Sequence, residues 1–146
     1  SFMRYPVISR LLNQDTIVWY LDVDTVMLHD LNRMKLVRDM DALFQDDGAL
    51  LSTGCMCFFP TQSSKALMEH MCNQRIDSTS DQAVLNENLD QFVMRIGRLD
   101  RASFPNGEML MKHADSVFNP ALVHANSMAG KETKISKLKE WNLWFA

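Results

Sequence analysis

The strongest hydrophobic pattern in the chain is the continuous apolar run at residues 16–21, which is rich in β-branched and aromatic side chains. Such a run is typical of a strand buried on both faces, as in the centre of a parallel or mixed sheet. Before it, residues 3–13 place apolar side chains at the spacing of a short amphipathic helix. The pattern therefore predicts a helix and then a central strand, with Asp22 and Asp24 directly after the strand.

The rest of the chain alternates between helical and extended patterns. We expect a helical turn at residues 30–34 and helices at 62–74, 80–89 and 132–141, with Ser80 as an N-cap. Short strands are expected at 49–52, 55–59, 92–96, 98–99 and 121–124, with a turn at 104–107. Between the first two strands, Gly54 either forms a bulge or tight turn or lets a ligand approach the backbone. Residues 36–44 give no clear pattern. This order favours an α/β fold, and the length favours a single domain over residues 1–146.

Composition and charge narrow the possible functions. The chain is 47% hydrophobic and 23% charged, as in ordinary globular proteins, and its net charge of −3 provides no basic field for nucleic acid. It contains neither an apolar stretch long enough to span a bilayer nor a signal-peptide pattern, so we expect any targeting or anchor segment to lie upstream. Three cysteines are too few for a disulfide framework and lack further zinc ligands nearby, which favours buried free thiols.

Asp22 and Asp24 are the leading candidates for chemistry. They follow a predicted strand at its C-terminal end, where open α/β sheets place their ligands, and strand alternation directs both side chains to one side. Their oxygens favour Mg²⁺ or Mn²⁺, although two aspartates at a strand end also occur simply in contact with solvent. An EF-hand is excluded because Met27 stands where that loop needs glycine.

A haloacid-dehalogenase-like phosphatase is an alternative for the same segment. In that interpretation Asp22 attacks phosphorus and Asp24 is the acid. Such an enzyme also needs a later lysine and a distal acidic pair. The acidic pair at residues 46–47 comes too early in the chain and precedes any suitable lysine.

Two further segments carry weaker signals, each with a structural alternative. Asp81 and Gln82 begin a predicted helix, where they either face a reacting centre or, through Asp81, complement the helix dipole. His124 follows an apolar strand and is either a metal ligand or a structural histidine. Lys131 and Lys134 follow it closely and are suited to bind phosphate, or else form a solvated helix face.

Taken in order, these segments resemble the nucleotide-diphospho-sugar transferase family, a group of GT-A-fold glycosyltransferases that includes relatives of plant cell-wall xylosyl- and arabinosyltransferases. The resemblance covers residues 15–146, and it rests on the ordered set because each piece is weak by itself. It outweighs the phosphatase alternative. The matching segments are Trp19–Asp24, Ser52–Gly54, Asp81–Gln82, Leu99–Asp100, Phe104–Gly107, Val123–Asn126, Gly130–Lys134 and Leu143–Trp144.

The resemblance implies metal-dependent transfer of a sugar from a nucleotide diphosphate to a hydroxyl, with retention of anomeric configuration. Asp22, Asp24 and His124 would hold Mn²⁺ or Mg²⁺, a Lewis acid that stabilises the departing diphosphate. Lys134, together with Lys131, would add positive charge at the phosphates.

The resemblance also assigns expected roles to the remaining motif residues. Gly130 would contribute to donor binding beside the two lysines, and Thr53 and Gly54 would border the donor sugar. Asp81 and Gln82 would lie near the anomeric carbon. Retention by front-face attack, with the leaving phosphate as base, would need no dedicated enzymic base.

Further expectations concern partners and completeness. A UDP-sugar is the first expectation for the donor and a glycan or glycoprotein for the acceptor, in the Golgi lumen if the full-length protein has an upstream anchor. Members of the family carry an N-terminal βαβ half that holds the nucleoside, and residues 3–13 look like the helix just before the D-x-D strand. We therefore expect this chain to lack that half. A second hypothesis follows: a truncated, non-catalytic domain of the same fold that binds metal or a partner without turnover.

Overall fold

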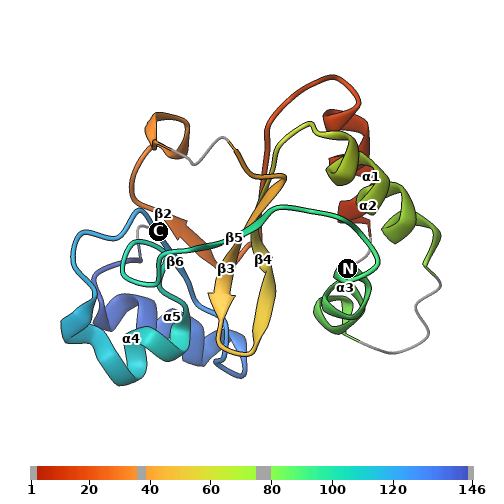
Figure 1. Ribbon diagram of the computed structural model, residues 1–146. Coiled ribbons are helices and arrows are strands. Elements are labelled where there is room, and N and C mark those ends of the chain that lie inside the picture. The colour runs from red at the N-terminus through yellow and green to blue at the C-terminus, as the bar shows by residue number, and fades with distance from the viewer. Residues whose placement is uncertain (1–2, 36–38, 75–79, 145–146) are drawn as a thin grey trace. The chain divides into compact units, whose positions relative to one another are not determined.

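The computed structural model describes residues 3–35, 39–74 and 80–144, and the chain divides into two compact units (Figure 1). The first unit comprises Ser1–Leu21 and Lys35–Leu99, and the second comprises Asp22–Met34 and Asp100–Ala146. Each unit is thus assembled from two separate stretches of chain. The prediction of one domain over residues 1–146 stays a prediction.

The first unit is built on a mixed four-stranded sheet, which confirms the predicted α/β class with a mixed sheet flanked by helices. The strand order is β1-β4-β3-β5. Both β1 and β3 run antiparallel to β4, and β5 runs parallel to β3. The strands span Val18–Leu21 (β1), Ala42–Asp47 (β3), Leu50–Phe58 (β4) and Ile96–Leu99 (β5).

Three helices share one hydrophobic core with this sheet: α1 (Arg4–Leu12), α2 (Gln62–Asn73) and α3 (Asp81–Leu89) (Figure 1). Strand register places Phe44 opposite Met56, so both side chains extend from the same face of the sheet, and the rings of Phe44 and Phe58 meet edge to face at 5.5 Å. These side chains are fully buried among apolar residues of all three helices. The three helices agree with the patterns at 3–13, 62–74 and 80–89.

The predicted central strand is wrong in one respect. Trp19, Tyr20 and Leu21 are only half-buried, and β1 ends the order of the described sheet. The strand whose residues are buried on both faces is β4, in which every residue from 51 to 58 is buried. Aromatic and β-branched residues favour any strand with one covered face, so their enrichment did not distinguish an outer strand from a central one.

Two other expectations for this unit are corrected. The strands predicted at 49–52 and 55–59 form one continuous strand, β4, in which Gly54 is an interior residue instead of part of a turn. The alternative of a bulge agrees with the structure, because the β3–β4 register shifts between Phe44 and Asp46, opposite this part of β4. The turn lies earlier, at Gly48, which has a φ of 75° and follows the unpredicted strand β3. In place of the strands expected at 92–96 and 98–99, the structure has one strand, β5, over Ile96–Leu99, and residues 92–95 lie outside it.

The second unit contains a two-stranded antiparallel sheet in which β2 (Thr25–Met27) pairs with β6 (Leu122–His124). Ala125, Met128 and Leu138 form its small buried cluster. Its helical elements are η1 (Leu31–Arg33), α4 (Gly107–His113), η2 (Ala114–Ser116) and α5 (Lys131–Glu140). The turn expected at 104–107 lies earlier, at residues 101–103, and Gly107 instead begins α4, which the sequence pattern missed. The N-terminus of α4 is capped by a hydrogen bond from the Met109 amide to the Asn106 side chain.

Two of the three cysteines are buried free thiols, as predicted. Cys55 and Cys57 lie on one face of β4, and burial raises the pKa of Cys57 to about 12, which makes its thiol unreactive. Cys72, by contrast, is a free thiol exposed near the end of α2.

Among the described helices, none combines the length and the apolar content needed to cross a bilayer.

Asp41 is a buried carboxylate that joins the start of β3 to the segment before β5. Its Oδ2 atom accepts a hydrogen bond from the Arg95 amide at 2.7 Å. Burial acts to raise the pKa of Asp41, but the hydrogen bonds from Arg95 and Thr61 and the charge of Arg95 outweigh it, so the pKa lies below its usual value. A lowered folded-state pKa means that ionised Asp41 stabilises the fold above the unfolded pKa, and this contribution is lost as pH falls through the folded pKa.

We predict that Asp41→Asn lowers the free energy of unfolding at neutral pH by about 1 kcal/mol and makes it less sensitive to acid below about pH 4. Urea unfolding followed by circular dichroism from about pH 7 to about pH 3 measures both effects. The exposed Asp90→Asn serves as the control. An acid dependence in Asp41→Asn as steep as in the wild type would contradict the assignment.

Candidate functional site

Asp22, Asp24 and His124 come together in the second unit as one cluster, called here the Asp–Asp–His cluster. One carboxylate oxygen from each aspartate and one imidazole nitrogen all lie within 4.8 Å of one another. Both aspartates are half-buried, whereas His124 is buried. The two aspartates come from the segment that leads into β2, and the histidine is the last residue of β6, so pairing of these two strands assembles the cluster.

Backbone hydrogen bonds fix the turn that carries the aspartates. The amide and the hydroxyl of Thr25 both donate to the carbonyl of Asp22, at 3.1 and 2.7 Å. The amide of Ala125 donates to the carbonyl of Asp24 at 2.9 Å. Because Ala125 follows His124 directly, this bond ties the aspartate turn to the histidine.

The segment at 104–107 holds His124 from its other side. The His124 amide donates to the carbonyl of Pro105 at 3.1 Å, and Asn106 forms a β-bridge with His124. The Gly107 amide donates to Asn126 Oδ1 at 3.0 Å. The motif at 104–107 therefore positions the motif at 123–126, a role that their separation in the sequence did not reveal.

Asp24 is the electrostatic centre of this unit. Its Oδ2 lies 2.5 Å from the Lys134 ammonium and its Oδ1 lies 3.4 Å from His124 Nε2. Burial acts to raise the pKa of Asp24, but the Lys134 hydrogen bond and the charges of His124 and Lys134 outweigh it and hold the pKa below its usual value. Asp24 is therefore an anion at neutral pH, as a ligand for a hard cation must be.

The ligand atoms of the Asp–Asp–His cluster fit a divalent cation. Two carboxylates and a neutral imidazole are ligands that Mn²⁺ and Mg²⁺ sites use, and the imidazole favours Mn²⁺ of the two. Asp24 also lines an open hollow of about 470 Å³, together with Val23, Met27, Leu138 and Trp144. The aspartate is thus reached from an open cavity in the same unit.

Thr53, Asp81 and Gln82 form a second set in the first unit. The Thr53 amide donates to Gln82 Oε1 and its hydroxyl donates to Asp81 Oδ1, both at 3.4 Å. The side-chain nitrogen Nε2 of Gln82 donates to Asp47 Oδ2 at 3.1 Å. The structure thus joins three predicted site residues from β4 and α3 in one network of side chains.

Arg4 is part of the same network and was missed by sequence reasoning. Its guanidinium donates to the Thr53 carbonyl at 2.6 Å and pairs with Asp81 Oδ2 at 3.1 Å. Ser80 stands at the N-cap of α3, but its side chain forms no capping hydrogen bond with the described first turn. The Asp81 side chain is thus engaged across the fold by Arg4, which a capping role alone does not explain.

The other residues predicted to bind the nucleotide-sugar donor are Gly54, Gly130 and Lys131. Gly54 is a buried residue inside β4. Gly130 precedes α5 with a φ of 84°, a backbone conformation that favours glycine, and Lys131 is exposed at the first position of that helix.

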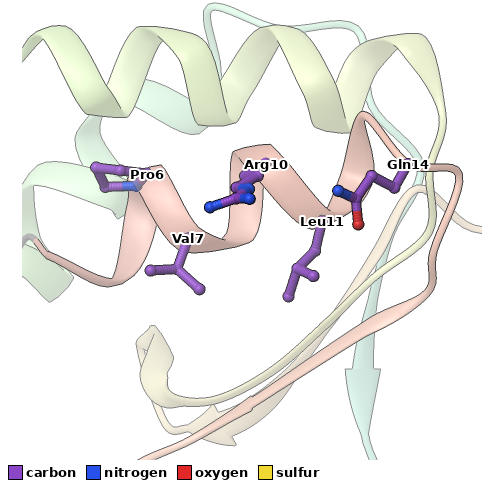
Figure 2. A pocket seen from close by; sticks show the side chains of 5 residues that line it. All are labelled: Pro6, Val7, Arg10, Leu11 and Gln14. Atoms are coloured by element: carbon purple, nitrogen blue, oxygen red, sulfur yellow. The ribbon is translucent and has the colours of Figure 1, made fainter.

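A separate groove of about 430 Å³ follows α1 and is lined by Pro6, Val7, Arg10, Leu11 and Gln14, none of which is a predicted site residue (Figure 2).

Comparison with known proteins gives one family and two similar folds. The family model for nucleotide-diphospho-sugar transferases matches residues 1–138, whereas no curated protein matches the sequence. A glycosyltransferase involved in the glycosylation of the major capsid of PBCV-1 is similar at a TM-score of 0.62 with 12% identity, over 95% of this chain and 75% of that one. The glycosyltransferase GlyE of Streptococcus pneumoniae TIGR4 is similar at 0.53 with 15% identity, over 97% of this chain and 43% of that one. The relation to plant cell-wall enzymes stays a prediction.

Gly107 offers a direct test of how His124 is held. A Cβ atom at Gly107 would lie 2.0 Å from the carbonyl oxygen of Asn126, so Gly107→Ala forces two backbone segments apart. We predict a loss of about 1–3 kcal/mol in the free energy of unfolding, measured with urea, and weaker Mn²⁺ binding by calorimetry. The exposed Met111→Ala in the same helix should stay within about 0.5 kcal/mol of the wild type. Unchanged stability of Gly107→Ala would show that this close approach is not maintained.

Proposed function

The chain belongs to the nucleotide-diphospho-sugar transferase family and is a glycosyltransferase, and we propose that it transfers a sugar from a nucleotide diphosphate with the help of a divalent cation held by the Asp–Asp–His cluster. The observation that carries the metal dependence is the convergence of three ligand atoms within 4.8 Å, from two segments far apart in the sequence. Three such ligands leave coordination positions for two phosphate oxygens of a donor.

The proposed cation is Mn²⁺, with Mg²⁺ as the alternative. When bound, it neutralises the charge that develops on the departing nucleoside diphosphate. Asp22 and Asp24 supply the charge that holds it, and the hydrogen-bonded turn at 22–25 keeps them in place. Lys134 lies at the same carboxylate and adds a positive charge for the diphosphate. Gly130 and Lys131, at the start of the same helix, are proposed to extend this phosphate-binding segment.

The network in the first unit is proposed to bind the sugar. Thr53 and Gly54 would border the donor sugar, and Asp81 with Gln82 would lie near its anomeric carbon. The side chains of Asp81 and Gln82 provide carboxylate and amide groups that form hydrogen bonds with sugar hydroxyls. We further propose that the donor is a UDP-sugar, that the acceptor is a glycan or glycoprotein, and that transfer retains the anomeric configuration. The proposed location of the protein is the Golgi lumen.

A donor screen tests this proposal. We expect a UDP-sugar with Mn²⁺ to give the fastest release of free nucleotide and CMP-sugars, which lack a diphosphate, to give the slowest. Asp24→Asn should weaken Mn²⁺ binding roughly tenfold or more and abolish release, whereas the exposed Asp115→Asn should behave as the wild type. Metal and nucleotide binding without release would favour the non-catalytic alternative, and hydrolysis of p-nitrophenyl phosphate would favour the phosphatase.

Lys134 gives a second, independent test of the cation site. Its ammonium occupies Asp24 Oδ2, an oxygen that a cation would use, so the two compete for one carboxylate. We predict that Lys134→Met binds Mn²⁺ alone more tightly but binds nucleoside diphosphate, at saturating Mn²⁺, roughly tenfold more weakly. Calorimetry measures both, with Lys139→Met on the exposed side of α5 as the control. Weaker Mn²⁺ binding by Lys134→Met would contradict the competition.

A further inference from the structure

Arg4 occupies a position that helix formation does not explain. It is the first residue of α1, where a positive charge opposes the helix dipole, and the first turn contains no acidic residue. Its side chain is only 8% exposed. Burying a charge is costly unless it is fully paired, and apolar residues at such positions are often as stabilising. A buried arginine at this place therefore points to a requirement for its specific chemistry.

The contacts of Arg4 join three elements of the first unit. One guanidinium nitrogen donates to the Thr53 carbonyl at 2.6 Å in β4, and another pairs with Asp81 at 3.1 Å in α3. The guanidinium carbon lies 4.4 Å from the ring centroid of Tyr20 in β1, so the planar group is held by its face as well as its edge. Lysine offers no such planar fork.

These contacts fix the Asp81 carboxylate. Its Oδ2 pairs with Arg4 and its Oδ1 accepts from the Thr53 hydroxyl, so both oxygens have defined directions. The Arg4 contact at the Thr53 carbonyl constrains the same residue whose amide meets Gln82. One side chain thus sets the orientation of the two residues proposed to lie near the anomeric carbon.

We propose that Arg4 is a positioning residue, which orients Asp81 and Gln82 toward the donor sugar and acts through them. This inference rests on the proposed function. Transfer depends on close alignment of the reacting groups, and a misplacement of about 1 Å costs about 100-fold in rate. Loss of Arg4 therefore lowers kcat and weakens the choice between epimeric donor sugars. The affinity for nucleoside diphosphate with Mn²⁺ stays unchanged, because none of the contacts of Arg4 described above is to a residue proposed to hold those groups.

The experiment compares Arg4→Met, Arg4→Lys and the matched control Arg10→Met, which replaces an exposed arginine of the same helix (Figure 2). We expect kcat to fall about 100-fold in Arg4→Met and roughly tenfold in Arg4→Lys, with KM for the donor little changed. Arg10→Met should retain the wild-type kcat. Thermal unfolding of each variant separates a loss of alignment from a loss of folded protein.

Two further arms show whether Arg4 acts through Asp81. In the Asp81→Ala background, Arg4→Met should cause little additional loss, because the group that Arg4 orients is already absent. Guanidinium ion at millimolar concentration should partly restore kcat to Arg4→Ala without changing its melting temperature, whereas a purely structural role predicts that both recover together. Additive losses in the double variant, or a rate that falls only with the folded fraction, would overturn the inference.

The outcomes separate this inference from the function on which it rests. Full kcat in the folded Arg4 variants, with turnover in the wild type, would overturn the role of Arg4 alone. Absence of nucleotide release from the wild type with every donor would overturn the proposed function, and the inference with it.

Discussion

The second unit depends on the carboxylate of Asp24. Its two oxygens meet His124 and Lys134, and its carbonyl accepts a hydrogen bond from Ala125, so one residue connects the start of β2, the end of β6 and α5. A partly buried carboxylate needs such partners, because an unpaired charge there would be strongly destabilising. The same partners keep Asp24 ionised, which makes it a suitable ligand for a cation. The contacts that stabilise the partly buried Asp24 carboxylate are therefore the same ones that keep it ready to bind a cation.

Two of the sequence motifs, at 104–107 and 123–126, contact each other in the structure. The motif at 104–107 looked like an isolated turn, yet its residues bridge to His124 and hydrogen-bond to Asn126. Gly107 stands where the backbone of Asn126 leaves no space for a side chain. The motifs at 104–107 and 123–126 are therefore two halves of one packed arrangement, although each is a weak signal when taken alone.

Much of this could be predicted from the sequence, and the failures have physical causes. Helical periodicity identified α1, α2, α3 and α5, and the grouping of Asp22 and Asp24 with His124 followed from motif order. The missed helix α4 is short, and its N-cap Asn106 lies in a segment whose turn chemistry dominated the pattern. The continuous strand β4 was divided at Gly54, since glycine in a strand gives the same local signal as a turn.

Arg4 shows the limit of local patterns most clearly. Its partners Thr53 and Asp81 lie in other elements of the first unit, far away in the sequence. The helical pattern at 3–13 identified the apolar face of α1 and gave no information about where a charge at its first residue would pair. Pairings of this kind depend on the tertiary fold, so a single sequence without relatives carries no signal for them.

The division of each unit between two stretches of chain has a consequence for how the protein is made. Asp24 and Lys134 are 110 residues apart, and β2 has no described partner strand until β6 has been synthesised. During synthesis the two aspartates are made before His124 and stay without this partner until residues 122–124 have been added. Loop-closure entropy makes such long-range pairing slow. Assembly of the Asp–Asp–His cluster therefore waits for the segment that contains β6 and for the folding step that pairs it with β2.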